Sequence, residues 1–82
     1  MPRVRFFGHL AQVLGTRSLE VEAATLGGLL TKLEERFGDD LRSRLGHCQI
    51  LLGEAPLDAE ADAARALDPD DEVGVLPPAA GG

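Results

Sequence analysis

Cysteine is almost absent from this sequence, because Cys48 is its only one. A single cysteine excludes a disulfide framework and a cysteine-rich metal site. His9 and His47 add two side chains that can bind metals, but three residues with no convergent fourth ligand fall short of a zinc pattern. We therefore interpret Cys48, which stands just before a predicted strand, as a small buried or half-buried residue.

Basic residues are scarce as well, since eight Lys and Arg stand against 14 Asp and Glu, for a formal net charge of -6. Nucleic-acid binding needs Lys and Arg to neutralise phosphates, so this balance argues against nucleic acid as a partner. The charge fits a protein that docks on a basic partner surface, and it equally fits one that is simply well solvated. Net charge alone does not separate these two interpretations.

Long apolar runs are missing too. No segment approaches the roughly 20 apolar residues that a membrane-spanning helix needs, and no secretory signal is visible. The chain has 82 residues, of which 44% are hydrophobic and 27% are charged, and it shows no internal repeat and no interdomain linker. These values predict one small globular domain without a membrane partner, and the reduced cytoplasm is its expected compartment.

What the sequence does contain is a clear order of strands around one helix. Residues 4–7, 18–23 and 72–76 alternate side chains or are rich in strand-forming residues, which predicts three strands. Residues 50–57 predict a strand, a glycine turn and a short continuation. The predicted helix stands between residues 18–23 and residues 50–57.

Residues 26–37 form the clearest predicted helix. Its apolar side chains recur with helical spacing and make one stripe: Leu26, Leu29, Leu30, Leu33 and Phe37. Thr25 is a good N-cap, and Gly38 is a usual C-cap residue. Gly27 and Gly28 weaken the first turn by roughly 1 kcal/mol each relative to Ala, and close packing against a strand is one explanation for them.

Two other segments are predicted as connections. Residues 8–15, bounded by glycines, predict a turn or one to two helical turns, and residues 58–71 predict an acidic loop with a short helical turn. The helix has one apolar stripe and each strand has one apolar face, so they can cover each other in two layers. We therefore predict an α+β fold in which one mixed sheet packs on one main helix.

This order of elements, followed by a Gly-Gly end, resembles the β-grasp, ubiquitin-like proteins. Within them the chain is most similar to the small subunit of molybdopterin synthase (MoaD) and the related ThiS-like sulfur carriers. The residues that carry the resemblance are "VRFFGHLAQVLG" at 4–15, the helix, and "LDPDDEVGVLPPAAGG" at 67–82. The resemblance implies a β-grasp domain over residues 1–76 and an extended, flexible C-terminal tail over residues 77–82.

The resemblance also implies a sulfur carrier that has no complete active site of its own. The carboxylate of Gly82 would be adenylated with ATP by a ubiquitin-activating-like (MoeB-like) enzyme and converted to a thiocarboxylate with sulfur from a donor. The sulfur would then pass to a pterin precursor in a MoaE-like large subunit, for molybdenum cofactor biosynthesis. The carrier itself would bind no cofactor and no metal.

The composition of the tail fits that chemistry. A terminal carboxylate has a pKa of about 3.5, so it is ionised at neutral pH and needs activation from outside. Pro77 and Pro78 would hold the tail extended and off the body of the domain at low ordering cost. Ala79 and Ala80 have small side chains, and Gly81 and Gly82 have no Cβ, so this end of the chain could pass through a narrow channel.

Strand alternation indicates a second site. Phe7, Leu51 and Leu76 point opposite to the inward residues of their strands, such as Val73 and Val75, so they face away from the helix. In a ubiquitin-like sheet the first, third and last strands are neighbours, and the three side chains would form one exposed apolar patch for a partner. The alternative is that flanking residues, or a register shift of one residue, bury them.

Other functions stay open at this point. The same resemblance extends to sulfur carriers for thiamine, cysteine, tungsten-pterin or tRNA thiolation, and to ubiquitin-like modifiers that are joined through Gly82 to lysines of other proteins. A plain interaction domain with an inert tail is a third class. The acidic run at residues 68–72 is interpreted as a solvated turn, and a contact for basic groups on the activating enzyme is its alternative.

Overall fold

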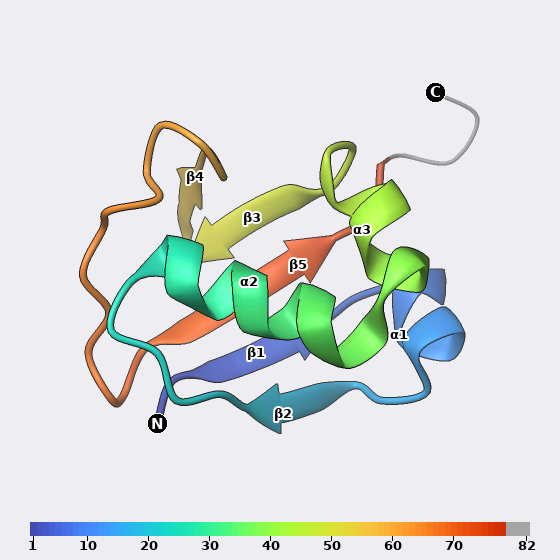
Figure 1. Ribbon diagram of the computed structural model, residues 1–82, viewed down its shortest axis with the longest axis horizontal. Coiled ribbons are helices and arrows are strands. Elements are labelled where there is room, and N and C mark those ends of the chain that lie inside the picture. The colour runs from blue at the N-terminus through green and yellow to red at the C-terminus, as the bar shows by residue number, and fades with distance from the viewer. Residues whose placement is uncertain (79–82) are drawn as a thin grey trace.

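A mixed sheet of five strands forms the centre of the computed structural model, which describes residues 1–78 (Figure 1). The first and last strands run parallel side by side, and the other neighbouring pairs are antiparallel. The spatial order is β2-β1-β5-β3-β4. The strands are β1 (Arg3–Phe6), β2 (Ser18–Glu20), β3 (Gln49–Leu52), β4 (Ala55–Leu57) and β5 (Glu72–Leu76).

The longest helix, α2 (Leu26–Phe37), crosses one face of this sheet (Figure 1). The shorter α1 (His9–Leu14) and α3 (Asp39–Leu45) lie together at the end of the sheet where the chain leaves β5. Within residues 1–78, no helix is long and apolar enough to cross a membrane. The predicted arrangement of one mixed sheet packed on one main helix is confirmed.

The hydrophobic core lies between α2 and the inner face of the sheet. Val4, Val73 and Val75 of the two central strands are fully buried, and they belong to one apolar cluster with the four leucines of the predicted helical stripe. Phe37, the last residue of that stripe, is half-buried and meets the ring of Phe6 edge to face, with 5.7 Å between ring centroids. Alternation in the strands and spacing in the helix therefore predict the core correctly.

Thr25 and Gly38 bound α2 as predicted. The Thr25 side-chain oxygen accepts a hydrogen bond from the Gly28 N–H at 3.1 Å, which satisfies one of the free donors of the first turn. Gly38 has a φ of 63°, and its N–H donates to the Glu34 carbonyl oxygen at 2.7 Å. Glycine adopts a positive φ readily, and a residue with a positive φ cannot continue a right-handed helix. α2 therefore ends at Gly38, and the chain turns directly into α3.

α3 is an element that the sequence patterns above do not predict. Asp39 and Asp40 occupy its first turn, and Arg42 and Arg44 occupy its last, so the charges complement the helix dipole at both ends. Leu41 is fully buried and attaches the helix to the core. A seven-residue helix with one buried side chain has no apolar stripe, and its pattern is therefore too short to recognise.

Two predicted strands differ from the observed ones in extent: residues 4–7 correspond to β1 (Arg3–Phe6), and residues 18–23 to β2 (Ser18–Glu20). β2 ends at Glu20 and not at residue 23, because its partner in β1 at that point is Arg3, the first residue of that strand. Val21 nevertheless stays buried, and its N–H donates to the Pro2 carbonyl oxygen at 3.0 Å. The hairpin predicted over residues 50–57 is confirmed as β3 and β4.

The start of α2 packs on the long connection between β4 and β5, and this contact explains Gly27. The Gly27 N–H donates to the Ala63 carbonyl oxygen at 2.8 Å, and a Cβ at Gly27 would lie 3.0 Å from that same oxygen. The neighbouring Leu26 N–H donates to the Arg65 carbonyl oxygen at 2.9 Å. The suggestion that a strand causes the close packing is thus wrong, since the neighbour is a loop backbone.

Exchanging each glycine of this first turn for alanine separates helix propensity from that contact. Gly28→Ala should raise the free energy of unfolding by up to about 1 kcal/mol, because its Cβ would meet only the Thr25 side-chain oxygen, at 3.3 Å. Gly27→Ala should lower it, because the new Cβ presses on a backbone carbonyl. Urea denaturation of both variants measures the difference, and equal stabilisation by the two would contradict the described packing.

Candidate functional site

The face of the sheet away from α2 carries the side chains that alternate with the core. β1, β5 and β3 lie next to one another, and the Phe7 N–H donates to the Val75 carbonyl oxygen at 3.1 Å, so Phe7 continues along β5 beyond the end of β1. Leu51 lies opposite Gly74 in the ladder, and Leu76 lies opposite Gln49. The structure therefore brings the three predicted contact residues, Phe7, Leu51 and Leu76, to one face.

These three side chains gather around Gly74, in the middle of β5. A Cβ at Gly74 would lie 3.2 Å from the Phe7 ring, 3.5 Å from Leu76 and 3.8 Å from Leu51. The missing side chain leaves a shallow pocket of about 200 Å³, which Gly53 and Glu72 also line. Phe7 is 40% exposed and the two leucines are half-buried. We call Phe7, Leu51, Gly74 and Leu76 the open-face patch, and its use by a partner stays a prediction.

Arg5 and Glu72 form a charged rim beside the open-face patch. The Arg5 guanidinium lies 5.9 Å from the centre of the Phe7 ring and 3.5 Å from a carboxylate oxygen of Glu72. Exposed ion pairs of this kind contribute little to stability. A partner that covers the patch would desolvate both charges, so the rim bears on the orientation of binding more than on the fold.

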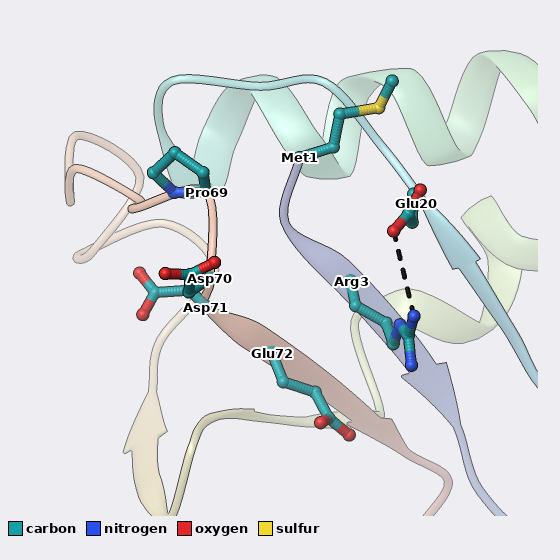
Figure 2. Close-up of a pocket in the computed structure, with 7 residues that line it drawn as sticks. All are labelled: Met1, Arg3, Glu20, Pro69, Asp70, Asp71 and Glu72. Carbon is teal, nitrogen blue, oxygen red and sulfur yellow. Dashed lines mark ion pairs between the residues drawn. The ribbon is translucent and has the colours of Figure 1, made fainter.

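The acidic turn before β5 lines a separate pocket, which shares Glu72 with the pocket of the open-face patch. Figure 2 shows Asp70 and Asp71 in a polar pocket near the start of β1, where Arg3 points toward Glu20, 3.8 Å away. A carboxylate oxygen of Asp71 accepts the Asp68 N–H at 2.7 Å and so closes the turn. Across residues 1–78, no group of acidic, histidine or cysteine side chains is placed to hold a metal ion.

β5 ends at Leu76 as predicted, and Pro77 then packs on the body of the domain. Pro77 is half-buried, and a Cβ at Gly8 would lie 3.2 Å from its Cγ. Gly8 has a φ of 59°, so this position favours glycine for its backbone as well as for space. Pro77 thus contacts the domain, whereas Pro78 is exposed. The prediction that the two prolines hold the tail extended and off the body concerns residues outside the described ones and stays a prediction.

The reactive end of the predicted site lies outside the described residues. This applies to the tail residues proposed to carry or thread the chemistry: Ala79, Ala80, Gly81 and Gly82. Their roles stay predictions. What the structure does give is the origin of the tail, which leaves the sheet from the same strand that carries Gly74 and Leu76 of the open-face patch.

Cys48 is half-buried beside the end of α3, as interpreted from the sequence. Burial raises the pKa of its thiol above the usual value, and the positive charge of Arg44 lowers it in part. The net upward direction leaves the thiol protonated at neutral pH, so Cys48 is not an activated nucleophile.

Two features of the site are missed by sequence reasoning. Gly74 creates the hollow of the open-face patch, and a glycine inside a predicted strand was the available signal, because it often marks a close approach. Arg44 acts on Cys48 from α3, and no local pattern indicates a contact from an unpredicted helix.

Comparison with known proteins identifies the family. The model of the ThiS family matches residues 4–82. The chain belongs to the ThiS family. Comparison with curated protein sequences gives no match.

Solved structures agree with this ThiS-family assignment. The chain is 26% identical to SAMP1 from Haloferax volcanii, with a TM-score of 0.81, covering 99% of this chain and 98% of that one. It is 30% identical to a chain in the complex of subunits 1 and 2 of the molybdopterin-converting factor from Helicobacter pylori, with a TM-score of 0.74 and coverage of 99% and 97%. The predicted β-grasp fold and sulfur-carrier family are confirmed.

A third similar structure shows the fold alone. In the BexX/CysO complex from Amycolatopsis orientalis, the matching chain is 17% identical with a TM-score of 0.79, and the match covers 100% of both chains. Solved structures with this fold therefore include proteins named for different roles, and the fold by itself does not assign a pathway.

The environment of Cys48 in this ThiS-family chain gives a testable pH dependence. Arg44→Gln removes the positive charge that lowers the thiol pKa, so the pKa should rise further and alkylation by iodoacetamide at pH 8 should slow. The rate, measured against pH, should show its midpoint at higher pH than in the original chain. Arg65→Gln, an exposed residue on the loop beside the start of α2, is the control and should leave the profile unchanged; an unchanged or faster rate in Arg44→Gln would contradict the assigned contact.

Proposed function

We propose that this chain is the sulfur-carrier small subunit of a molybdopterin synthase, with the carboxylate of Gly82 as its reacting group. The observation that carries the proposal is the exit of the tail from β5, the strand that also supplies Gly74 and Leu76 to the open-face patch. A partner that covers the patch is thereby positioned to receive the tail. Thirty per cent identity to a chain in the Helicobacter pylori complex supports the choice of pathway.

Two partners follow from the chemistry. In a MoeB-like activating enzyme, a Gly82 carboxylate oxygen would attack the α-phosphorus of ATP and release pyrophosphate, and the resulting acyl adenylate has an electrophilic carbonyl carbon. A sulfur donor would then displace AMP and leave a thiocarboxylate, whose sulfur is a good nucleophile for a pterin precursor held by a MoaE-like large subunit. We place these steps in the cytoplasm, where ATP is available.

The residues of this chain contribute position and not catalysis. Pro77, packed beside Gly8, fixes the point from which the tail leaves the domain. Gly81 and Gly82 have no Cβ, so a partner's channel needs to clear only the backbone near the reacting carbon. The open-face patch and its Arg5–Glu72 rim would provide the docking surface that holds the tail at the channel.

A protein modifier is the second candidate, and the similarity to SAMP1 supports it. Such a modifier would use the same adenylated Gly82 but would end in an amide bond to a lysine of another protein. The two functions differ in the final state of Gly82, which mass spectrometry distinguishes directly.

Incubation with an activating enzyme, ATP and a sulfur donor tests the carrier function. Intact-mass spectrometry should show the mass gain of one sulfur-for-oxygen exchange, located on Gly82 by fragmentation. Deleting Gly82, or adding one alanine after it, should abolish pterin synthesis with the large subunit, because the reacting carbon is displaced by about 3.5 Å along the tail. Full synthesis by the extended chain would overturn the proposal, and conjugates on lysines without thiocarboxylate would favour the modifier.

Substitutions on the open face test the docking surface separately. Phe7→Asp and Leu76→Asp should each weaken binding to the large subunit at least about tenfold, because a charge would be buried among apolar side chains. Val13→Asp is the matched control, since Val13 is also exposed, at 37%, but lies on α1 away from the patch. Isothermal titration measures the Kd, and circular dichroism checks the fold. Unchanged affinity in both patch variants would refute this surface.

A further inference from the structure

The hollow at Gly74 has two chemically different ends. Phe7 lies at one end, where a Cβ at Gly74 would come within 3.2 Å of the ring, and Glu72 lines the other, two residues earlier in β5. Leu51 forms the wall on the β3 side, and the whole hollow measures about 200 Å³. It therefore runs from an apolar ring to a carboxylate.

On this face of the sheet, the strands supply cations only from β1. The one beside the hollow is Arg5, which lies 3.5 Å from the Oε1 atom of Glu72. Across β5, residues 49–57 make up β3, β4 and their turn and contain no Lys or Arg. The Gly53 N–H donates to the Glu72 carbonyl oxygen at 3.0 Å, which brings that turn beside Glu72. The hollow thus has a carboxylate in its lining, and no Lys or Arg of residues 1–78 lines it.

Arg5 shows how a guanidinium is held at this place. It lies 5.9 Å from the centre of the Phe7 ring and contacts Glu72 through one carboxylate oxygen, Oε1. Within residues 1–78, Oε2 of Glu72 has no hydrogen bond or ion pair, and the side chain is 48% exposed. An ionised carboxylate accepts from several donors through its two oxygens. Glu72 can therefore accept a second cationic donor from the side of the hollow without losing Arg5.

One kind of side chain satisfies both ends of the hollow. An aliphatic side chain would fill it but would cover the Glu72 carboxylate without offering a hydrogen bond, which is costly. An acidic side chain would be repelled by the same carboxylate. Lys and Arg have an aliphatic stem that packs on apolar surface and a charged head that reaches a polar group. The net charge of -6 also favours a partner with a basic surface.

We propose that the hollow binds one Lys or Arg side chain of the large subunit that docks on the open-face patch. The proposal rests on the proposed function, which supplies that partner. The aliphatic stem lies over Gly74 against Leu51, and the cation pairs with Oε2 of Glu72. Gly74 is then a specificity-determining residue, because a side chain at this position would occupy the space of the stem.

A small-molecule probe tests the hollow without any partner protein. The full chain, isotope-labelled for NMR, is titrated with n-butylguanidinium and, separately, with n-butylurea, a neutral molecule of nearly the same shape. Butylguanidinium should shift the amide signals of Leu51 and Gly74, and butylurea should shift them several-fold less. Glu72→Gln should remove this difference between the probes. Equal shifts by the two probes, no shift by either, or an undiminished difference in Glu72→Gln would overturn the proposal.

Glu20→Gln is the matched control for the charge. Glu20 lies opposite Arg3, which in turn lies opposite Glu72, so both carboxylates are on the same face of the sheet. Glu20 also has an arginine partner, Arg3 at 3.8 Å, but it does not line the hollow. The difference between the two probes should therefore persist in full in Glu20→Gln.

Binding to the large subunit tests the occupant in the complex. Gly74→Ala and Glu72→Gln should each lower the affinity about tenfold or more in isothermal titration, because the first fills the hollow and the second removes the charged acceptor. Glu20→Gln should change the affinity less than about twofold. The urea midpoint of Gly74→Ala should not fall, because its Cβ meets the far ends of the Phe7 and Leu76 side chains and alanine loses less backbone entropy than glycine.

Different results would refute the occupant of the hollow and the proposed function. Unchanged affinity in both Gly74→Ala and Glu72→Gln, together with weakened binding in Phe7→Asp, would remove the basic side chain from the hollow and leave the open-face patch as the docking surface. A chain that gains no thiocarboxylate would instead refute the proposed function, whatever the two probes show.

Discussion

The parallel pairing of β1 with β5 is the constraint on which the rest of this structure depends. It places the last strand in the middle of the sheet, between the first strand and β3. Val4 and Val73, partners in that ladder, are both fully buried. The C-terminal tail therefore begins at the best-anchored part of the domain and not at a fraying edge. Under the proposed function, in which Gly82 reacts, this pairing fixes the base of the tail in space.

The same pairing divides each central strand between two roles. Val73 and Val75 face α2 and stabilise the fold, and Gly74 and Leu76 face outward and form part of the open-face patch. Because side chains alternate with a period of two, neither set can change sides without a register shift that would expose the core. Substitutions on the outer face are thus separable from the packing of the core.

The sequence predicts those parts of the fold that depend on local order. Alternation in β5, the leucine stripe of α2 and the Thr25 cap are all properties of residues close together in the chain, and each was predicted correctly. The misses are contacts between residues distant in sequence. Gly27 meets Ala63, Pro77 meets Gly8, and neither pair shares a local pattern. α3 is missed for a related reason, because a single buried leucine, Leu41, anchors it to the core.

The candidate site divides in the same way. The three apolar residues of the open face follow from strand alternation together with the order of strands in a ubiquitin-like sheet. The hollow at Gly74 and the influence of Arg44 on Cys48 require the packed structure, because they depend on which elements become neighbours. The chemistry proposed for Gly82 rests on the family, because glycine has no side chain that could indicate it.

The contact of Pro77 with Gly8 sets a length scale for the protein's partners. Pro77 is held on the domain and Pro78 is the last described residue, with Gly82 four residues further along the sequence. A fully extended segment of that size spans at most about 14 Å. Under the proposed function, an enzyme that acts on Gly82 must bring its reacting atoms within about that distance of Pro78. A partner with a deeper active site would be out of range, whatever its affinity for the sheet.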